Sequence, residues 1–279
     1  MNIIRNELIK STFDGYFVAW NLSKGGRSGF HASSLIAPDK GTKAFCYREH
    51  ILGIDHKRIP SEYSLQTLRV FSNGWELHRK WQGILQIAGV ALYNEVEHFI
   101  DLSEIKGYVP DRAFTDVGVS GDMHRTTTIP SNGFALSFTP DSIIMYQGKP
   151  TVVEIKGYRN ETYAKVVANP QTHQSYKDAK VQANLYMHLL GLKKSIILFD
   201  NKNDQNFFTI EEEYEPELIA PYVERGDKLQ LCIDRYREGK IVKGVCATKD
   251  CTRAHACQMR DVCFEVPALR ERYRLDYEV

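Results

Sequence analysis

The chain has 279 residues, 43% of them hydrophobic, and its 36 basic and 35 acidic side chains give a formal net charge of +1. This length and apolar content suffice for a sizeable core. The sequence contains no run of about 18 apolar residues, so no membrane span is expected. The balanced charge gives no globally basic signature of nucleic-acid binding, so only a local basic groove is compatible with such a partner.

The first twenty residues contain an early acidic side chain and lack a secretory apolar segment with a cleavage site. We therefore expect a cytoplasmic protein. Six cysteines are present, at positions 46, 232, 246, 251, 257 and 263. In a reducing compartment, the close spacing of the last four favours a metal or cluster site over disulfides.

The first long element predicted is a helix over residues 61–88, with a possible break at Asn73-Gly74. A strand and loops are expected to follow, up to about residue 128. This segment carries three acidic side chains, at Glu95, Glu97 and Asp122, that are candidates for extra acidic groups of a site, although solvated charges are the expected role of each.

A β-hairpin is predicted in the middle of the chain. Its arms are the apolar runs Ser142–Tyr146 and Thr151–Val153, and a turn-forming stretch centred on Gln147-Gly148 joins them. Equal steps back from this turn bring Asp141 opposite Glu154. Alternation along the second arm puts Glu154 and Lys156 on one face. Two carboxylates and an ammonium at the end of an apolar hairpin indicate a divalent-metal site.

The rest of the chain alternates between predicted helices and strands. Residues 157–174 are largely polar and are expected to form a mobile loop, and residues 175–190 form an amphipathic helix that ends at Gly191. Buried strands are predicted at 194–199 and 207–210, before a helix that reaches about residue 238. This order predicts an α/β fold with a mixed central sheet flanked by helices.

The hairpin residues resemble a known signature. Pro140-Asp141 followed by Glu154-Ile155-Lys156 looks like the motif of the PD-(D/E)XK nucleases, and residues 136–141 are similar to the aspartate-bearing segment of the RecB-like branch, which includes CRISPR-associated exonucleases. That branch usually has glycine where Phe138 stands. The resemblance implies a restriction-endonuclease-like core. It also implies that Asp141, Glu154 and the Ile155 carbonyl bind Mg²⁺ or Mn²⁺ and that Lys156 is catalytic.

Two further motifs match the same branch in order. Gly74–His78 resembles the helical motif in which histidine helps to bind the metal, which implies this role for His78. Residues 182–186 look like the QxxxY motif, in which Gln182 and Tyr186 face the active site and the DNA. Spacing alone favours His78 as a carboxylate partner or a surface residue. It favours Tyr186 as a residue at the edge of the core, with Gln182 exposed.

The cysteines resemble the one-plus-three arrangement that holds a [4Fe-4S] cluster in AddB-like and CRISPR-associated nucleases. The resemblance implies four ligands, which are Cys46, Cys251, Cys257 and Cys263. The family commonly has two residues between its first two C-terminal cysteines, whereas five separate Cys251 from Cys257. Cys246 is therefore an additional candidate, and structural zinc with His255 as a possible ligand remains an alternative. Cys232 is expected to be a core residue.

Together these resemblances imply one nuclease domain over residues 1–279. Its core would span about 62–212, and helical N-terminal and cysteine-rich C-terminal parts, about 30–60 and 215–265, would form a cluster-binding lobe. The implied function is a metal-dependent exonuclease on single-stranded DNA ends in recombination, repair or CRISPR adaptation, with a helicase or CRISPR integrase as a possible partner. Two alternatives are a non-catalytic nucleic-acid-binding or assembly module of the same fold and a small zinc-stabilised interaction protein.

Overall fold

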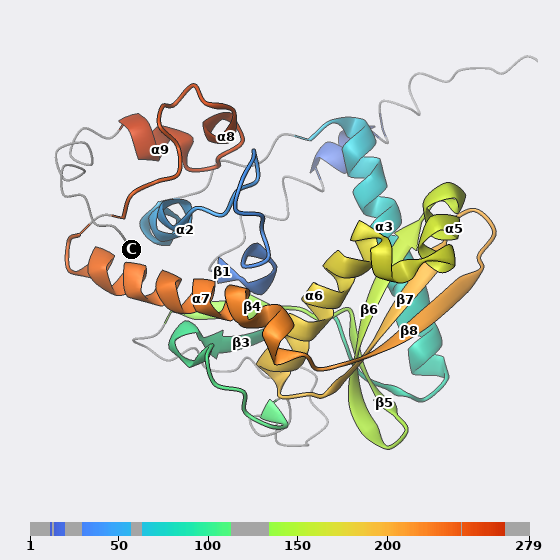
Figure 1. Cartoon of the computed structure of the whole chain (residues 1–279). Coiled ribbons are helices and arrows are strands. Elements are labelled where there is room, and N and C mark those ends of the chain that lie inside the picture. Colours follow the sequence, from blue (N-terminus) through green and yellow to red (C-terminus); the bar gives the residue numbers. More distant parts are fainter. Residues whose placement is uncertain are drawn as a thin grey trace, which may run out of the picture.

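The computed structural model describes residues 12, 14–19, 30–56, 63–112, 134–240 and 242–265, so Asp122 lies outside the described residues. Within these ranges, helices and strands form a mixed α/β arrangement (Figure 1). A five-stranded sheet has the order β2-β5-β6-β7-β8, and a three-stranded sheet has the order β1-β4-β3. No helix in the described part of the chain is long and apolar enough to cross a membrane.

The larger sheet is mixed, as the sequence predicts. Its strands are β2 (Ala91–Asn94), β5 (Ser142–Tyr146), β6 (Lys149–Tyr158), β7 (Lys194–Asn201) and β8 (Phe207–Glu213). Only β6 and β7 pair in parallel, and the other neighbours are antiparallel. A parallel pair needs a long crossover. Helices α5 (Asn160–Ala168) and α6 (Gln174–Leu190), with the 3-10 turn η3 (Pro170–Thr172) between them, provide it.

The predicted hairpin is confirmed in its register. Ser142 pairs with Val153 and Tyr146 with Lys149, so the turn consists of Gln147 and Gly148. Both turn residues have positive φ angles, of 49° and 72°, as a two-residue hairpin turn requires. One further step of this register places Asp141 opposite Glu154.

Two expectations about local structure are wrong. Residues 157–174 are not a loop, because β6 continues to Tyr158 and α5 follows; α5 reads as polar because Val166 is its one buried residue. Helix α3 (Leu65–Ile87) runs through Asn73-Gly74 without a break. A helical glycine costs only about 1 kcal/mol, and the packing of the same helix against the sheet stabilises it.

Helices cover both faces of the larger sheet. On one face, Leu77 and Trp81 of α3 pack against a cluster that includes Val153 and Ile155. On the other, the cluster formed by α5 and α6 includes Ala183, Ile197 and Phe199. Adjacent strand residues face opposite sides, so Glu154 and Lys156 lie on the face covered by α6.

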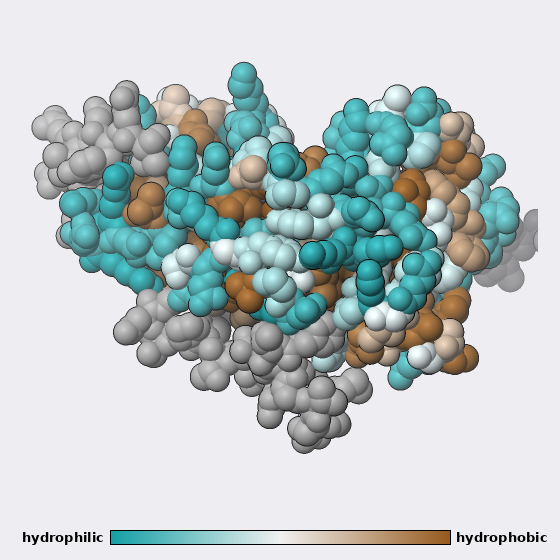
Figure 2. Space-filling view, turned by 60° about the horizontal axis from the view of Figure 1, so that its bottom comes forward, coloured by the Kyte–Doolittle hydropathy of each residue, from teal (hydrophilic) through white to brown (hydrophobic). Residues whose placement is uncertain are grey.

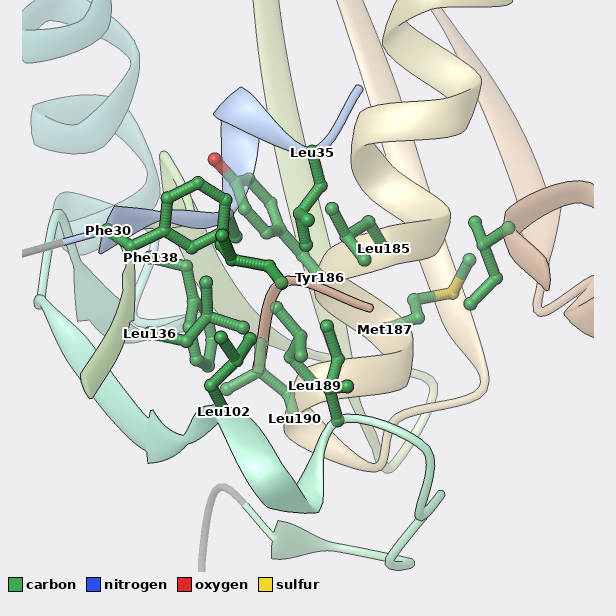
Figure 3. Packing of buried hydrophobic residues seen from close by; sticks show 14 of the residues in the cluster. Phe30, Leu35, Leu102, Leu136, Phe138, Leu185, Tyr186, Met187, Leu189 and Leu190 are labelled. Atoms are coloured by element: carbon green, nitrogen blue, oxygen red, sulfur yellow. The ribbon is translucent and has the colours of Figure 1, made fainter. Parts of the chain in front are cut away.

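The smaller sheet and α6 enclose the main core. Its strands are β1 (Phe30–His31), β3 (His98–Asp101) and β4 (Ala135–Phe138), and the 3-10 turns η1 (Ala32–Ser34) and η2 (Leu102–Glu104) follow β1 and β3. Leu136 and Phe138 lie against Tyr186 and Leu189 of α6 (Figure 3). This packing brings the segment after β1 beside α6, next to the end of the hairpin.

The remaining helices are α2 (Tyr47–Asp55), α7 (Pro216–Arg237), α8 (Thr252–His255) and α9 (Arg260–Glu265). Leu52 of α2 and Met259 share a small buried cluster. Arg48 donates to the Cys263 carbonyl at 2.8 Å, and Arg253 Nε donates to the Ala44 carbonyl at 2.9 Å. These contacts join residues 44–56 to residues 242–265 in a part of the molecule that we term the cysteine lobe (Figure 1). Cys232 is fully buried on α7, as expected.

Candidate active site

The end of the β5–β6 hairpin gathers the predicted acidic residues. Asp141 Oδ2 accepts a hydrogen bond from the Ile155 backbone N–H at 2.7 Å. On β6, which also carries Ile155, Lys156 Nζ lies 2.5 Å from Glu154 Oε1, and the Glu154 side chain is fully buried. Because the ladder of β6 fixes Glu154, Ile155 and Lys156 in alternation, the strand register itself sets the position of these groups.

Helix α3 places His78 at the same point. His78 Nδ1 lies 3.3 Å from Asp141 Oδ1 and 3.5 Å from Glu95 Oε1. One helical turn further on, Gln82 Nε2 donates to the Asp141 backbone carbonyl at 2.9 Å. Helix α3 therefore contacts Asp141 through two side chains on one face.

The position of α3 depends on its anchor to the sheet. Trp81 Nε1 and Lys80 Nζ both donate to Asp200 Oδ2, at 2.8 and 2.9 Å. Gly157 lets the helix approach, because a Cβ atom there would lie 2.2 Å from Leu77 Cδ2. The absence of a side chain at Gly157, directly after Lys156, is therefore a packing requirement.

Helix α6 contributes the two residues of the predicted QxxxY motif. Lys156 Nζ donates to Gln182 Oε1 at 3.3 Å, and Gln182 Nε2 donates to the Tyr186 hydroxyl at 3.2 Å. Tyr186 is 2% exposed and packs in the main core, so its hydroxyl alone reaches the site (Figure 3). The structure thus joins Glu154, Lys156, Gln182 and Tyr186 in one chain of contacts.

The two buried carboxylates, Asp141 and Glu154, shift the pKa values of the groups around them. Burial and the neighbouring charge of Glu154 raise the pKa of Asp141 to about 7. Burial lowers the pKa of His78, but the hydrogen bond with Glu95 and the charges of Asp141 and Glu154 more than offset this, so the net shift is upward. The pKa of Lys156 is likewise raised, because the two carboxylates outweigh its burial.

A divalent cation fits this donor set. Glu154 Oε2 is buried and has no hydrogen-bond partner, and Asp141 Oδ1 faces the imidazole. Among the described residues, no three His, Cys, Asp or Glu side chains already surround a common point as a complete metal cage. Mg²⁺ does not need such a cage, because it keeps several water ligands and is bound through one or two carboxylates. Asp141 and Glu154 supply these two groups.

The site opens into a cleft of about 500 Å³. Residues that the sequence analysis did not assign to the site also line it, namely His31, Ser33, Glu95, Glu97 and Thr139. Glu95 and Glu97 are both exposed, as expected of solvated charges, and Glu95 Oε1 in addition lies 3.5 Å from His78 Nδ1. Glu95 has a φ angle of 47°, an uncommon conformation for a non-glycine residue, and no sequence pattern signalled its approach to His78.

The four cysteines that the resemblance implied are only partly brought together. Cys46, Cys257 and Cys263 line one small pocket, and the fourth thiol there is Cys246. Cys251 instead begins α8, where its sulfur accepts from the Ala254 N–H. Burial, and to a lesser extent a hydrogen bond with the Cys251 thiol, raise the pKa of Cys246 to about 12. His255 is exposed and does not line the pocket.

The sequence matches no protein-family model and no curated protein. Similar solved structures include the structure of SSO0001, with 15% identity and a TM-score of 0.43 over 78% of this chain and 87% of that one. The alkaline exonuclease LHK-Exo in complex with dAMP has 14% identity and a TM-score of 0.44, over 76% and 91% of the two chains. A second structure of LHK-Exo, from Laribacter hongkongensis, has 17% identity and a TM-score of 0.30 over 37% and 54%. The functional assignment rests on the geometry of the site.

Proposed function

We propose that the chain is a metal-dependent deoxyribonuclease of the PD-(D/E)XK type that removes nucleotides from single-stranded DNA ends. One observation carries this proposal: Asp141, Glu154 and Lys156 meet at the end of one hairpin, and His78 and Gln182 reach them from two helices. A non-catalytic module would have no need for a buried carboxylate with an unpaired oxygen, because such a group destabilises the fold.

Asp141 and Glu154 would hold Mg²⁺ or Mn²⁺, with the Ile155 carbonyl as a further ligand. When bound, the cation lowers the pKa of a water molecule and neutralises charge on the scissile phosphate. His78 is a ligand in this scheme, and the Ile155 N–H keeps Asp141 in place through its hydrogen bond to Oδ2.

Lys156 provides the positive charge next to the reacting phosphate. Its ammonium lies between Glu154 Oε1 and Gln182 Oε1, so it is already oriented before substrate arrives. Preorganised charge of this kind stabilises a transition state without a reorganisation cost. Gln182, held by Tyr186, positions the strand beside the ammonium.

Cleavage of end-labelled oligonucleotides tests the proposal. The protein is incubated with linear single strands, linear duplexes and circular single strands, in Mn²⁺, in Mg²⁺ or in EDTA. The proposal predicts metal-dependent release of short products from linear single strands and no attack on circles. Absence of cleavage with either metal would contradict it, and cleavage of circles would replace the exonuclease with an endonuclease.

We propose further that the cysteine lobe binds a metal centre through Cys46, Cys246, Cys257 and Cys263. These four cysteines line one pocket, and four thiolates are a ligand set that suits either a [4Fe-4S] cluster or zinc. The pocket has room for about 10 Å³, roughly one atom, and among the described residues no three of these side chains already form a metal site, so either centre requires the thiols to rearrange. The visible spectrum of anaerobically purified protein, with its iron and zinc content, separates the two; protein free of both metals would refute the centre.

In this scheme the whole chain is one nuclease domain, with a core over about residues 62–212. The cluster or zinc would hold Cys46 and the three C-terminal cysteines together, which closes a long loop. A helicase or a recombination or CRISPR integrase is the kind of partner that would present DNA ends to such an enzyme. Co-purification of the chain with such a partner tests this part.

A further inference from the structure

Helix α3 carries exposed aromatic side chains beside the candidate site. Phe71 is 45% and Trp75 is 39% exposed. With about 100° of rotation per residue, Phe71, Trp75 and His78 fall within an arc of roughly 60°, which also includes Gln82. Since His78 and Gln82 both contact Asp141, the two aromatic rings continue the helix face that contacts the site.

The aromatic residues extend away from the site along one direction. At about 1.5 Å per residue, Trp75 lies about 5 Å and Phe71 about 10 Å beyond His78 along the helix axis. In Figure 1 this N-terminal half of α3 projects past the edge of the larger sheet. A length of about 10 Å corresponds to roughly three stacked nucleotides at 3.4 Å each.

Positive charge accompanies the rings. The Arg79 guanidinium lies 4.8 Å from the centre of the Trp75 ring; its side chain is 57% exposed and forms a surface ion pair with Glu76 at 3.6 Å, which solvent screens. Tyr63, 44% exposed, meets Phe71 edge to face at 5.1 Å. Aromatic faces interleaved with arginine suit a polymer that has flat bases and anionic phosphates. They suit a purely apolar protein partner less well, because arginine would have to be desolvated there.

The outline of the molecule is notched. In Figure 2 the notch separates the left-hand part of the molecule from the right-hand part. The cleft at Asp141 receives His31 and Ser33 from β1 and η1 and Gln182 from α6. A single DNA strand whose end enters this cleft would pass along the N-terminal half of α3.

We propose that Trp75 and Phe71 form a stacking platform for the bases of single-stranded DNA on one side of the scissile phosphate. The inference rests on the proposed nuclease function. Trp75 stacks on the base nearest the site, Phe71 stacks on a base further along the strand, and Arg79 contacts a phosphate between them. Such stacking is tolerant of sequence, because every base has a flat face, as an enzyme that proceeds along a strand requires.

Fluorescence anisotropy tests the platform directly. A fluorescein-labelled oligothymidylate of about 20 nucleotides is titrated in EDTA, so that no cleavage occurs. Trp75→Ala and Phe71→Ala are each expected to raise Kd about tenfold, and Trp75→Phe is expected to restore most of the affinity. Ile87→Ala is the matched control, because Ile87 is 90% exposed on the opposite face of the same helix. Unchanged binding by Trp75→Ala and Phe71→Ala would overturn the platform.

A small substrate separates this inference from the proposed function. Hydrolysis of bis(p-nitrophenyl) phosphate in Mn²⁺ needs the carboxylates but no base stacking, so Trp75→Ala should hydrolyse it at the wild-type rate. Normal hydrolysis together with wild-type oligonucleotide affinity in Trp75→Ala refutes the platform and keeps the nuclease. Wild-type protein that cleaves neither this diester nor DNA refutes the proposed function, and wild-type protein that does not bind the oligonucleotide refutes the platform.

Discussion

The carboxylate site and the cysteine lobe are held in place by different means. Glu154 lies on a central strand between β5 and β7, so main-chain ladders on both sides fix it. In the cysteine lobe, the short helices α8, with four residues, and α9, with six, pack against α2 through a small cluster that includes Leu52 and Met259. The fold alone therefore fixes the first region, whereas side-chain links maintain the second, which is the situation in which a metal centre contributes most.

The largest expected effect tests the carboxylate site. Replacing Lys156 with Ala should reduce kcat for DNA cleavage roughly 10³-fold, because a preorganised charge is removed from the transition state. Far-UV circular dichroism should remain as in the wild type, since β6 keeps its ladder, whereas the thermal unfolding midpoint should fall, because the buried Glu154 loses its partner. Lys149→Ala, an exposed position on the same strand, is the control. Equal rates for the two variants would remove Lys156 from the mechanism.

The next effect tests the links of the cysteine lobe. Arg253 donates to the Ala44 carbonyl and to Glu49, and both charged side chains are about 85% buried, with exposures of 13% and 15%. Arg253→Ala should destabilise the lobe by about 3 kcal/mol, because Glu49 is left without its partner.

Hydrogen exchange is the measurement for Arg253→Ala. Residues 242–265 should exchange faster, while β6 and β7 keep their protection. Faster exchange in the sheet as well would show that the two regions do not unfold separately. Arg237→Ala, at an exposed position on α7, provides a control with the same change of charge.

Acid pH should lower the folding stability of the protein through His98, which packs on Phe138 close to Asp141 in the sequence. Burial lowers the pKa of His98 to about 4, and its ring stacks on Phe138 at 5.4 Å. The unfolded state therefore binds more protons than the folded state between about pH 6.5 and 4, and stability falls as the pH decreases through this window. The expected loss is about 2 kcal/mol, given about 1.4 kcal/mol per pKa unit and some remaining solvent contact.

Urea unfolding at several pH values checks this loss in wild type and His98→Phe. The pKa of Asp141 is raised, so Asp141 contributes with the opposite sign, but it does so in both proteins. The difference between the two curves therefore isolates the imidazole. Parallel curves for wild type and variant would contradict the assignment of a neutral, buried His98.

The smallest effect concerns His78. His78→Ala should reduce cleavage about tenfold and raise the Mn²⁺ concentration needed for half-maximal rate, since the side chain orients or supplements the carboxylate ligands. If Glu95 acts through His78, Glu95→Gln should slow DNA cleavage in the wild type but not in His78→Ala. The two single variants and the double variant form a double-mutant cycle that measures this. Additive effects would show that Glu95 does not act through His78.

Sequence pattern was sufficient for the hairpin, because two β-branched arms and a Gln-Gly turn determine the register and hence the Asp141–Glu154 pairing. It was also sufficient for α6, whose C-terminus is marked by Gly191 with a φ angle of 72°. Helix α5 was missed because one buried residue per nine leaves no apolar periodicity.

The residues of the site that the sequence did not predict are placed there by tertiary contacts. Glu95 approaches His78 through a left-handed backbone conformation that follows no sequence rule, and His31 and Ser33 reach the cleft only because β1 pairs with β4. Gln82 was predictable in principle, because it lies four residues after His78 on the same helix face. The order of thiols around the small pocket was not predictable, since the spacing of Cys246 and Cys251 allows either to join Cys257.

The most direct measurement is the binding of Mn²⁺ by the carboxylate site, which electron paramagnetic resonance detects. It is made on wild type, on Glu154→Gln and on the control Glu213→Gln, whose position on β8 is exposed. DNA cleavage is assayed in the same preparations. The account predicts saturable Mn²⁺ binding and cleavage in wild type and Glu213→Gln, and the loss of both in folded Glu154→Gln. Unchanged Mn²⁺ binding and cleavage in Glu154→Gln would contradict it.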